Sequence, residues 1–178
     1  LSLLTCVGLR AQVEFPAPSP LGELEQRVGL TDITIQYSRP SMKGRTIFGG
    51  LVPYGEMWRT GANATTTLKF SDEVSLEGNK VPAGEYGLYT IPGKTEWTIV
   101  ISKSIGSGLG EYKEEEDVTR FKVKSVNLSS PVERFTIEVA DITNNSANIV
   151  LRWDKTEAAL KMECDTDAKV MSQIKEIM

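Results

Sequence analysis

Short segments of alternating apolar and polar residues recur along most of this chain. In the segment TDITIQYSR, Ile33, Ile35 and Tyr37 alternate with polar residues, which is the period of two expected of a half-buried β-strand. Further segments of this kind are TTTLKF, EVSLEGNK, EYGLYTIPGKTEWTIVIS, VTRFKVKSV, VERFTIEVA, ANIVLRWD and TEAALKMEC. Turn-forming residues bound these segments, and no helical period separates them. The pattern therefore predicts an all-β fold, an antiparallel β-sandwich or jelly roll.

The clearest hairpin lies in the segment VPAGEYGLYTIPGKTEWTIVISK. Tyr86 and Leu88 mark one face of its first strand, Pro92 and Gly93 supply the turn, and Trp97 begins the returning strand. Local sequence is enough to pair these two strands.

Only the last segment, DTDAKVMSQIKEIM, has a helical pattern. Asp165 or Thr166 can cap it, and Val170, Ile174 and Ile177 recur at the spacing of one helix face. We expect a short C-terminal helix that covers an edge of the sandwich or leads into a further segment. The predicted organisation is a signal peptide at 1–11, an extended Pro-rich arm and first strand at 12–29, a β-sandwich domain at 30–164 and the helix at 165–178.

The sequence begins with the apolar run LSLLTCVGL, followed by polar residues and the small residue Ala11. This order is typical of the end of a secretory signal, and the run is too short to span a bilayer. We expect a periplasmic or secreted protein, with a buried first strand as the alternative.

Thr5 is bulkier than the residue that usually precedes a lipid-anchor cysteine, so we expect no anchor on Cys6. Cys164 would then be the single free thiol, a small buried hydrophobe or, alternatively, a reactive group.

Because the chain has no histidine, several kinds of catalytic and metal-binding site are excluded. The chain has no His and a formal net charge of −4, so Ser-His-Asp and Cys-His pairs and His metal ligands are excluded. The acidic balance argues against a nucleic-acid partner.

An acidic run contains Glu111, Glu114, Glu115, Glu116 and Asp117. It suits a solvated loop better than a calcium site, because adjacent carboxylates converge poorly. We expect no metal and no cofactor.

Residues 37–66, YSRPSMKGRTIFGGLVPYGEMWRTGANATT, interrupt the alternating pattern. Between positions 39 and 61 four cationic residues stand against Glu56 alone, a local net charge of +3. Several Gly and Pro residues favour a long loop, and its aromatic residues supply enough apolar area to pack it against the sheet. The sequence therefore predicts a long structured loop with a cationic and aromatic surface, and long packed loops are usually functional.

The loop supplies the candidate ligand-binding residues. They are Tyr37, Arg39, Lys43, Arg45, Tyr54, Trp58, Arg59 and Asn63. Their donors suit a carboxylate, phosphate or sulfate group, and the rings suit a sugar face or flat ring. In the alternative interpretation the arginines tie loop carbonyls together and only hold the backbone.

Three motifs in order carry a resemblance to a known family. The loop segment, PAGEYGLYTIP and EWTIVISK together resemble the bacterial envelope proteins grouped as domain of unknown function 2911, over Phe15 to Cys164. The resemblance implies an exported all-β domain and no established activity. The residues it marks as shared are Arg39, Lys43, Gly44, Arg45, Trp58, Arg59, Gly61, Asn63 and Thr65. This chain has Leu109-Gly110 where members often have Trp-Gly, which puts a stacking role at that position in doubt.

These observations lead to one functional hypothesis and two alternatives. The first is a non-catalytic binding module of the cell envelope that recognises a small anionic or glycan ligand through the loop. The second is a hydrolase acting on envelope glycans or peptides, with Glu56 and Lys43 as weak catalytic candidates. The third is a purely structural envelope domain. We expect no transmembrane segment, and a homodimer stays open.

Overall fold

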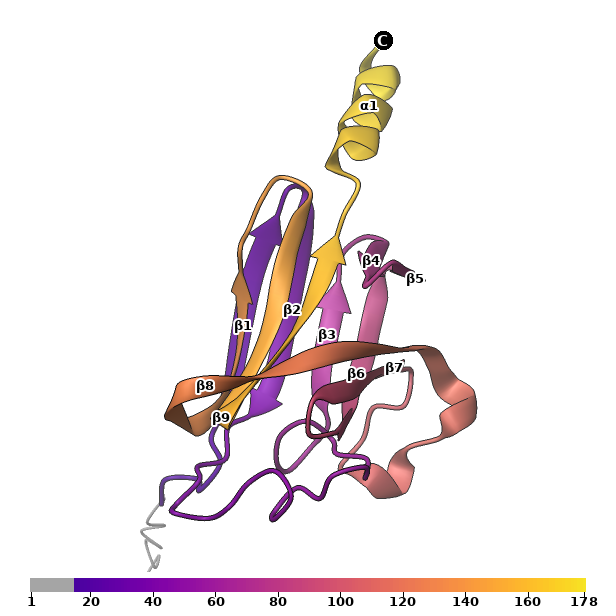
Figure 1. Cartoon of the computed structure of the whole chain (residues 1–178). Helices are drawn as coiled ribbons and strands as arrows, with labels where there is room; N and C mark the ends of the chain where they lie inside the picture. Colours follow the sequence, from indigo (N-terminus) through magenta and orange to yellow (C-terminus); the bar gives the residue numbers. More distant parts are fainter. Residues whose placement is uncertain (1–14) are drawn as a thin grey trace, which may run out of the picture.

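The computed structural model describes residues 15–178, and Figure 1 shows a protein built from β-strands with one C-terminal helix. The predicted signal peptide at 1–11, with Cys6, lies outside the described residues. The strands are β1 (Leu21–Val28), β2 (Thr31–Ser38), β3 (Thr66–Phe70), β4 (Val74–Leu76), β5 (Asn79–Val81), β6 (Gly84–Pro92), β7 (Glu96–Ser102), β8 (Asp117–Ala140) and β9 (Ser146–Glu163). Two 3-10 turns, η1 (Leu109–Glu111) and η2 (Glu114–Glu116), precede β8, and α1 (Thr166–Ile177) follows β9. The predicted all-β class is confirmed.

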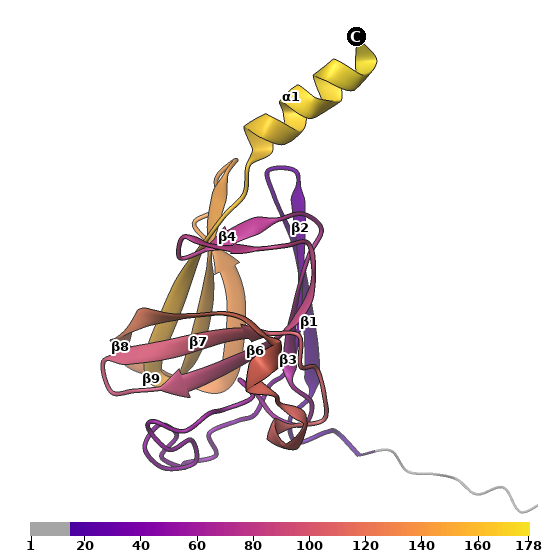
Figure 2. The same ribbon diagram turned by 90° about the vertical axis from the view of Figure 1, so that its right-hand side faces the viewer.

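All strands pair antiparallel in one sheet of order β1-β2-β3-β6-β7-β8-β9-β4-β5, which stays open at β1 and β5. The long strand β8 turns the sheet back on itself, as Figure 2 shows. Its first part pairs with β7 and its second part with β9, and the register shifts between Asn127 and Thr136. The sheet thereby forms two facing layers, and the Tyr37 hydroxyl of β2 donates to the carbonyl of Ile137 in β8 at 3.1 Å.

The sequence placed the β6–β7 hairpin correctly, with Pro92 opposite Trp97. It divided β8 and β9 into two strands each, and here the prediction was wrong. The turn-like residues NLSSP after Val126 form an irregularity inside β8 and do not end the strand. Asp154 has a left-handed φ of 52° and lies inside β9 in the same way. Bulges bend a strand without breaking its ladder, and local sequence does not distinguish them from turns.

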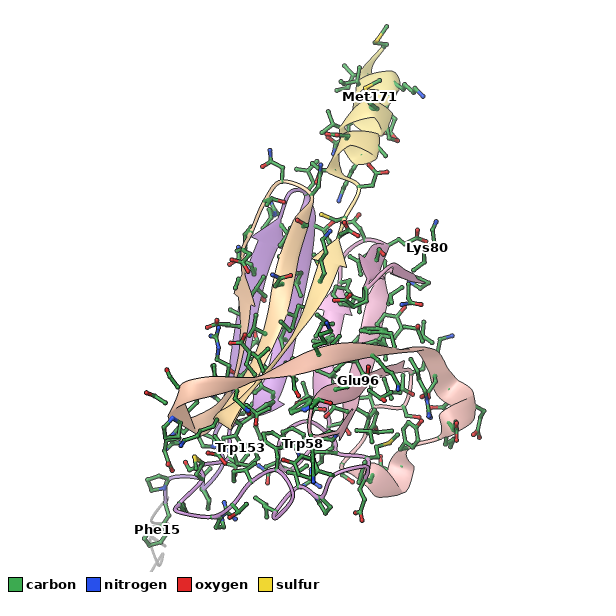
Figure 3. All side chains as sticks on the ribbon, in the orientation of Figure 1. Phe15, Trp58, Lys80, Glu96, Trp153 and Met171 are labelled. Carbon is green, nitrogen blue, oxygen red and sulfur yellow. The ribbon has the colours of Figure 1, made fainter. Side chains whose placement is uncertain are left out.

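The core ends in an aromatic cluster at the end of the sheet opposite α1, where Figure 3 labels Trp58 and Trp153. These two indole rings stack with centroids 5.8 Å apart and an interplanar angle of 20°. Phe48, Trp97 and Phe135 surround the pair at centroid distances of 5.0–6.4 Å from the Trp58 ring. Such contacts contribute about 0.5–1.5 kcal/mol per pair beyond the area they bury. The cluster closes this end of the fold and supports the loop of residues 39–65 between β2 and β3.

Helix α1 begins where the sequence predicted, with the Asp165 carboxylate accepting from the backbone N–H of Ala168 at 2.9 Å. It does not cover an edge of the sheet. No residue of α1 is buried, and Figure 1 shows the helix projecting from the sheet. The predicted apolar stripe of Val170, Ile174 and Ile177 faces solvent.

Among residues 15–178, no helix is long and apolar enough to cross a membrane. Cys164, just before the helix, is buried as expected.

Candidate functional site

The loop of residues 39–65 joins β2 to β3 and is fixed to strands on two sides. The backbone of Trp58 exchanges hydrogen bonds with Thr90 of β6, at 2.7 and 2.9 Å. On the other side, the N–H of Met42 donates to the carbonyl of Glu133 at 2.8 Å, and the N–H of Phe135 donates to that of Pro40 at 2.9 Å. The predicted long structured loop is therefore confirmed. Sites on such supported loops are positioned more rigidly than sites on free ones.

A tight turn from Trp58 to Gly61 directs the side chains of this part of the loop. Thr60 adopts a left-handed φ of 58°, which is costly for a β-branched residue. Its buried hydroxyl donates to Thr90 Oγ1 at 3.1 Å, and Trp58 Nε1 donates to the carbonyl of Gly61 at 3.0 Å. Gly61 has a φ of 153°, a conformation reserved largely for glycine. The turn buries Thr60 and leaves Arg59 on the wall of a cavity.

The cavity lies between the loop, the aromatic cluster and the segment that contains η1. Its volume of about 410 Å³ falls within the range of small-molecule sites. Its charged wall residues are Arg45, Glu56 and Arg59, and its aromatic ones are Trp58 and Trp153. Its apolar aliphatic wall includes Leu51, Val52, Met57 and Leu109. The cavity therefore combines both signs of charge with apolar walls.

The two arginines of the cavity differ in their hydrogen bonding. Arg45 donates from Nε to the carbonyl of Met42 at 2.9 Å and from Nη2 to that of Ser41 at 2.6 Å. The Nε of Arg59 is buried and has no hydrogen-bond partner in the described part of the chain. This Nε has almost no accessible surface and so does not open onto the cavity, whereas Arg59 as a residue is partly exposed and lines it.

Glu56 is exposed on the cavity wall, three positions before Arg59 in the chain. The ion pairs found within residues 15–178 include neither Glu56 nor Arg59. The two opposite charges therefore line one cavity without neutralising each other directly.

Of the eight predicted ligand-binding residues, Arg45, Trp58 and Arg59 line the cavity. Tyr37 and Arg39 instead bind the second part of β8. Arg39 donates from Nε to the carbonyl of Phe135 at 3.2 Å and from Nη2 to Thr136 Oγ1 at 3.0 Å. The Tyr37 hydroxyl, besides donating to Ile137, accepts from its N–H at 3.0 Å. These two side chains join the facing layers.

Asn63, Lys43 and Tyr54 also lie away from the cavity. Asn63 adopts a left-handed φ of 59°, and its amide donates to Ser38 Oγ at 3.2 Å. Lys43 is exposed at a loop tip, also with a positive φ. Tyr54 packs over Gly49, where an added Cβ would lie 2.6 Å from the ring. Of the weak catalytic candidates, Glu56 lines the cavity and Lys43 does not.

The aromatic rings form the floor of the cavity and present little surface to it. Trp58 is 9% exposed and Trp153 is 1% exposed, because each ring is covered by the other and by Phe48. The exposed walls are aliphatic instead, with Leu51 48% and Leu109 41% exposed. Of the rings expected to stack on a ligand, Trp58 is therefore largely enclosed, and Tyr54, which is 41% exposed, lies outside the cavity.

Sequence reasoning did not select Trp153 or the aliphatic wall as site residues, and it noted Leu109 only as a position where family members often have Trp. Trp153 lies in β9 with an ordinary alternating pattern, which indicated core and nothing more. Leu51 follows two glycines in the loop, and an apolar residue at such a turn was the available signal. Leu109 comes from η1, about fifty residues along the chain from Arg59, and reaches the cavity only through the fold.

The acidic run before β8 is held by interactions within the chain. Glu116 accepts from Ser104 Oγ at 2.7 Å and pairs with Lys113 at 3.3 Å, and the first of these bonds chiefly lowers its pKa. Asp117 accepts from Tyr112 at 2.8 Å and from Arg120 at 2.6 Å. Burial, together with the Asp117 carboxylate, raises the pKa of Tyr112 to about 12. Residues 15–178 contain no group of three or more side chains arranged as metal ligands.

Comparison with protein-family models gives a match over residues 19–162, which is most of the chain. The matching family is described as "Protein of unknown function (DUF2911)". Comparisons with curated proteins and with solved structures give no match.

Proposed function

The chain belongs to the DUF2911 family, and on this premise we propose that it is a non-catalytic binding module whose cavity takes a small ligand with an anionic group. The observation that carries this proposal is Arg59, a partly exposed cation on the cavity wall that forms no ion pair among residues 15–178. A carboxylate would supply the missing partner.

The energetics support an anion at this position. Hydrogen bonds between a guanidinium and a carboxylate are charge-assisted and often bidentate, so an anionic ligand would gain affinity from Arg59, which no carboxylate of residues 15–178 already pairs. The strained turn at Thr60 fixes the backbone next to Arg59 before the ligand arrives, so binding loses less backbone entropy.

At the cavity the hydrolase alternative has no observation in its favour, whereas Arg45 binds two loop carbonyls as the structural alternative expects. A sugar ring would stack on an aromatic face, and the faces of Trp58 and Trp153 are enclosed. A glycosidase would need a pair of carboxylates, and Glu56 is the one carboxylate among the described residues that line the cavity. Arg39 and Tyr37 do act as structural locks, which is compatible with a binding role for Arg59. Export to the envelope remains a prediction from residues 1–11.

Thermal unfolding with small anions tests the binding proposal. The probes are 4-methylpentanoate, inorganic phosphate and sulfate, added to the wild type, to Arg59→Ala and to Lys43→Ala. Lys43→Ala is the matched control, because it removes the same charge from the same loop away from the cavity. A ligand that binds only the native state raises its stability by mass action. We expect at least one anion to raise the Tm of the wild type and Lys43→Ala but not of Arg59→Ala. An equal rise in all three proteins, or none with any anion, would overturn the proposal.

A further inference from the structure

We propose that the ligand of this cavity is a free α-amino acid with an aliphatic side chain, an inference that rests on the proposed anion-binding function. Three features of the cavity lead to it: two opposite charges that do not pair, aliphatic walls, and a small volume.

The first step concerns charge. Glu56 and Arg59 line the same cavity, yet no ion pair within 4.0 Å joins them in the described chain. Two separated opposite charges are complementary to a zwitterion, whose carboxylate would meet Arg59 and whose ammonium would meet Glu56. A simple monoanion would use Arg59 and leave Glu56 as a repulsive neighbour. Glu56 is thus explained by a ligand that also carries a positive group.

The second step assigns the carboxylate to Arg59 and not to Arg45. Two of the Arg45 donor groups are already used by the carbonyls of Ser41 and Met42. Those bonds hold the loop backbone, and a ligand would have to compete with them. Arg59 forms no ion pair with a carboxylate of residues 15–178, so a ligand carboxylate would displace none.

The third step concerns the body of the ligand. Leu51 and Leu109 expose 48% and 41% of their surface and line the cavity from two separate segments. Met57 and Pro53 extend the same apolar wall. Sugar hydroxyls would lose water there without gaining partners, whereas an aliphatic side chain would bury apolar area on both sides. The volume of about 410 Å³ is near the lower end for small-molecule sites and suits a ligand of amino-acid size.

Isothermal titration calorimetry of the full chain tests each group of the ligand separately. The probes are L-leucine, 4-methylpentanoate, which lacks the ammonium group, leucinamide, which lacks the carboxylate, and N-acetyl-leucine, which resembles a peptide end. We expect L-leucine to bind most tightly. Each analogue should bind more weakly by at least about tenfold, because each loses one charge-assisted hydrogen bond.

Variants assign the two contacts. Glu56→Gln should weaken L-leucine binding by about tenfold or more, since the ammonium contact is lost, and should not weaken 4-methylpentanoate binding, since it removes only a repulsive charge. Arg59→Ala should abolish binding of both, and Lys43→Ala should change neither. Glu56 is exposed, so the glutamine variant is expected to keep the wild-type circular dichroism spectrum and Tm.

The outcomes separate this inference from the proposed function. If 4-methylpentanoate binds as well as L-leucine and Glu56→Gln changes neither, the zwitterion is rejected while anion binding at Arg59 stands. If N-acetyl-leucine binds more tightly than L-leucine, the ligand is a peptide carboxyl end and the amino-acid proposal is overturned. If no carboxylate binds while phosphate or sulfate does so through Arg59, the amino-acid proposal is overturned and the anion proposal stands; if none of these anions binds, both proposals fail.

Discussion

Arg39, Arg45 and Arg59 leave the same loop and end in different surroundings. Arg39 is bound by two groups of β8 that lie 96 and 97 positions away in the sequence. Arg45 is bound by carbonyls three and four positions before it. Arg59 has an Nε without a partner in residues 15–178. The residue type predicts a donor in each case, but only the fold decides whether an acceptor lies within reach.

The difference between Arg39 and Arg59 predicts different effects on stability. Arg39→Ala removes two hydrogen bonds from a charged group and should lower the free energy of unfolding by about 1.5–3 kcal/mol. Arg59→Ala removes a group whose Nε has no partner and should change it by no more than about 0.5 kcal/mol. Urea unfolding followed by tryptophan fluorescence measures both values. Equal losses for the two variants would mean that Arg59 is a structural lock like Arg39, which would remove the basis of the proposed site.

At the scale of elements, α1 is attached to the body by its first turn alone. Lys169 Nζ lies 2.8 Å from each carboxylate oxygen of Asp72 and donates to the carbonyl of Leu30 at 2.9 Å. Thr166 donates to the carbonyl of Asn144 at 2.6 Å. Beyond this turn the apolar residues Val170, Met171 and Ile174 are exposed. Polar contacts therefore determine how the helix is held.

These contacts predict that acid releases the first turn of α1. The hydrogen bond from Lys169 is the main cause that lowers the pKa of Asp72. A folded-state pKa below the unfolded value of about 3.9 contributes stability above that pH, and the contribution is lost as pH falls through the folded pKa. Amide chemical shifts of Ala168 and Lys169 should therefore move toward disordered values below about pH 4.

The variant Asp72→Asn provides the control for this titration. It lacks the carboxylate, so its α1 amides should show the released shifts already at neutral pH and should not titrate with Asp72. If the wild-type helix keeps its shifts through the acid range, Leu30 and Asn144 hold the turn without help from the ion pair.

Elements encoded by neighbouring residues were predictable, and elements that depend on distant partners were not. The β6–β7 hairpin and the start of α1 follow from a turn and a cap that act within a few residues. The continuity of β8 was missed because its irregular middle resembles a turn until β7 and β9 pair with its two ends. The sequence predicted that the apolar face of α1 would cover an edge of the sheet, but this face is exposed. Its periodicity marks an apolar face and does not show which element, if any, packs against it.

For the whole molecule, the aromatic cluster connects the loop to both layers of the sheet. Trp58 comes from the loop, Trp97 from β7, Phe135 from β8 and Trp153 from β9, and all four are buried together. The sequence predicted that the loop would be cationic and ordered. It did not predict the cavity, because walls such as Leu109 and Trp153 reach Arg59 only when the sheet has folded over. Charge placement is a local property of sequence, whereas concavity is a property of the assembled fold.

This arrangement predicts that the cavity exists only in the globally folded protein. Native-state hydrogen exchange should show the backbone N–H groups of Trp58 and Thr90, which bond each other's carbonyls, exchanging with the free energy of global unfolding, as the core of β6 does. The amides of residues 171–177 should exchange much faster, since that part of α1 has no buried residue. If the Trp58 amide instead opens at a lower free energy than the β6 core, the loop is a separate unit and Arg59 is not held ready for a ligand. The affinity of the cavity would then include the entropy of ordering the loop.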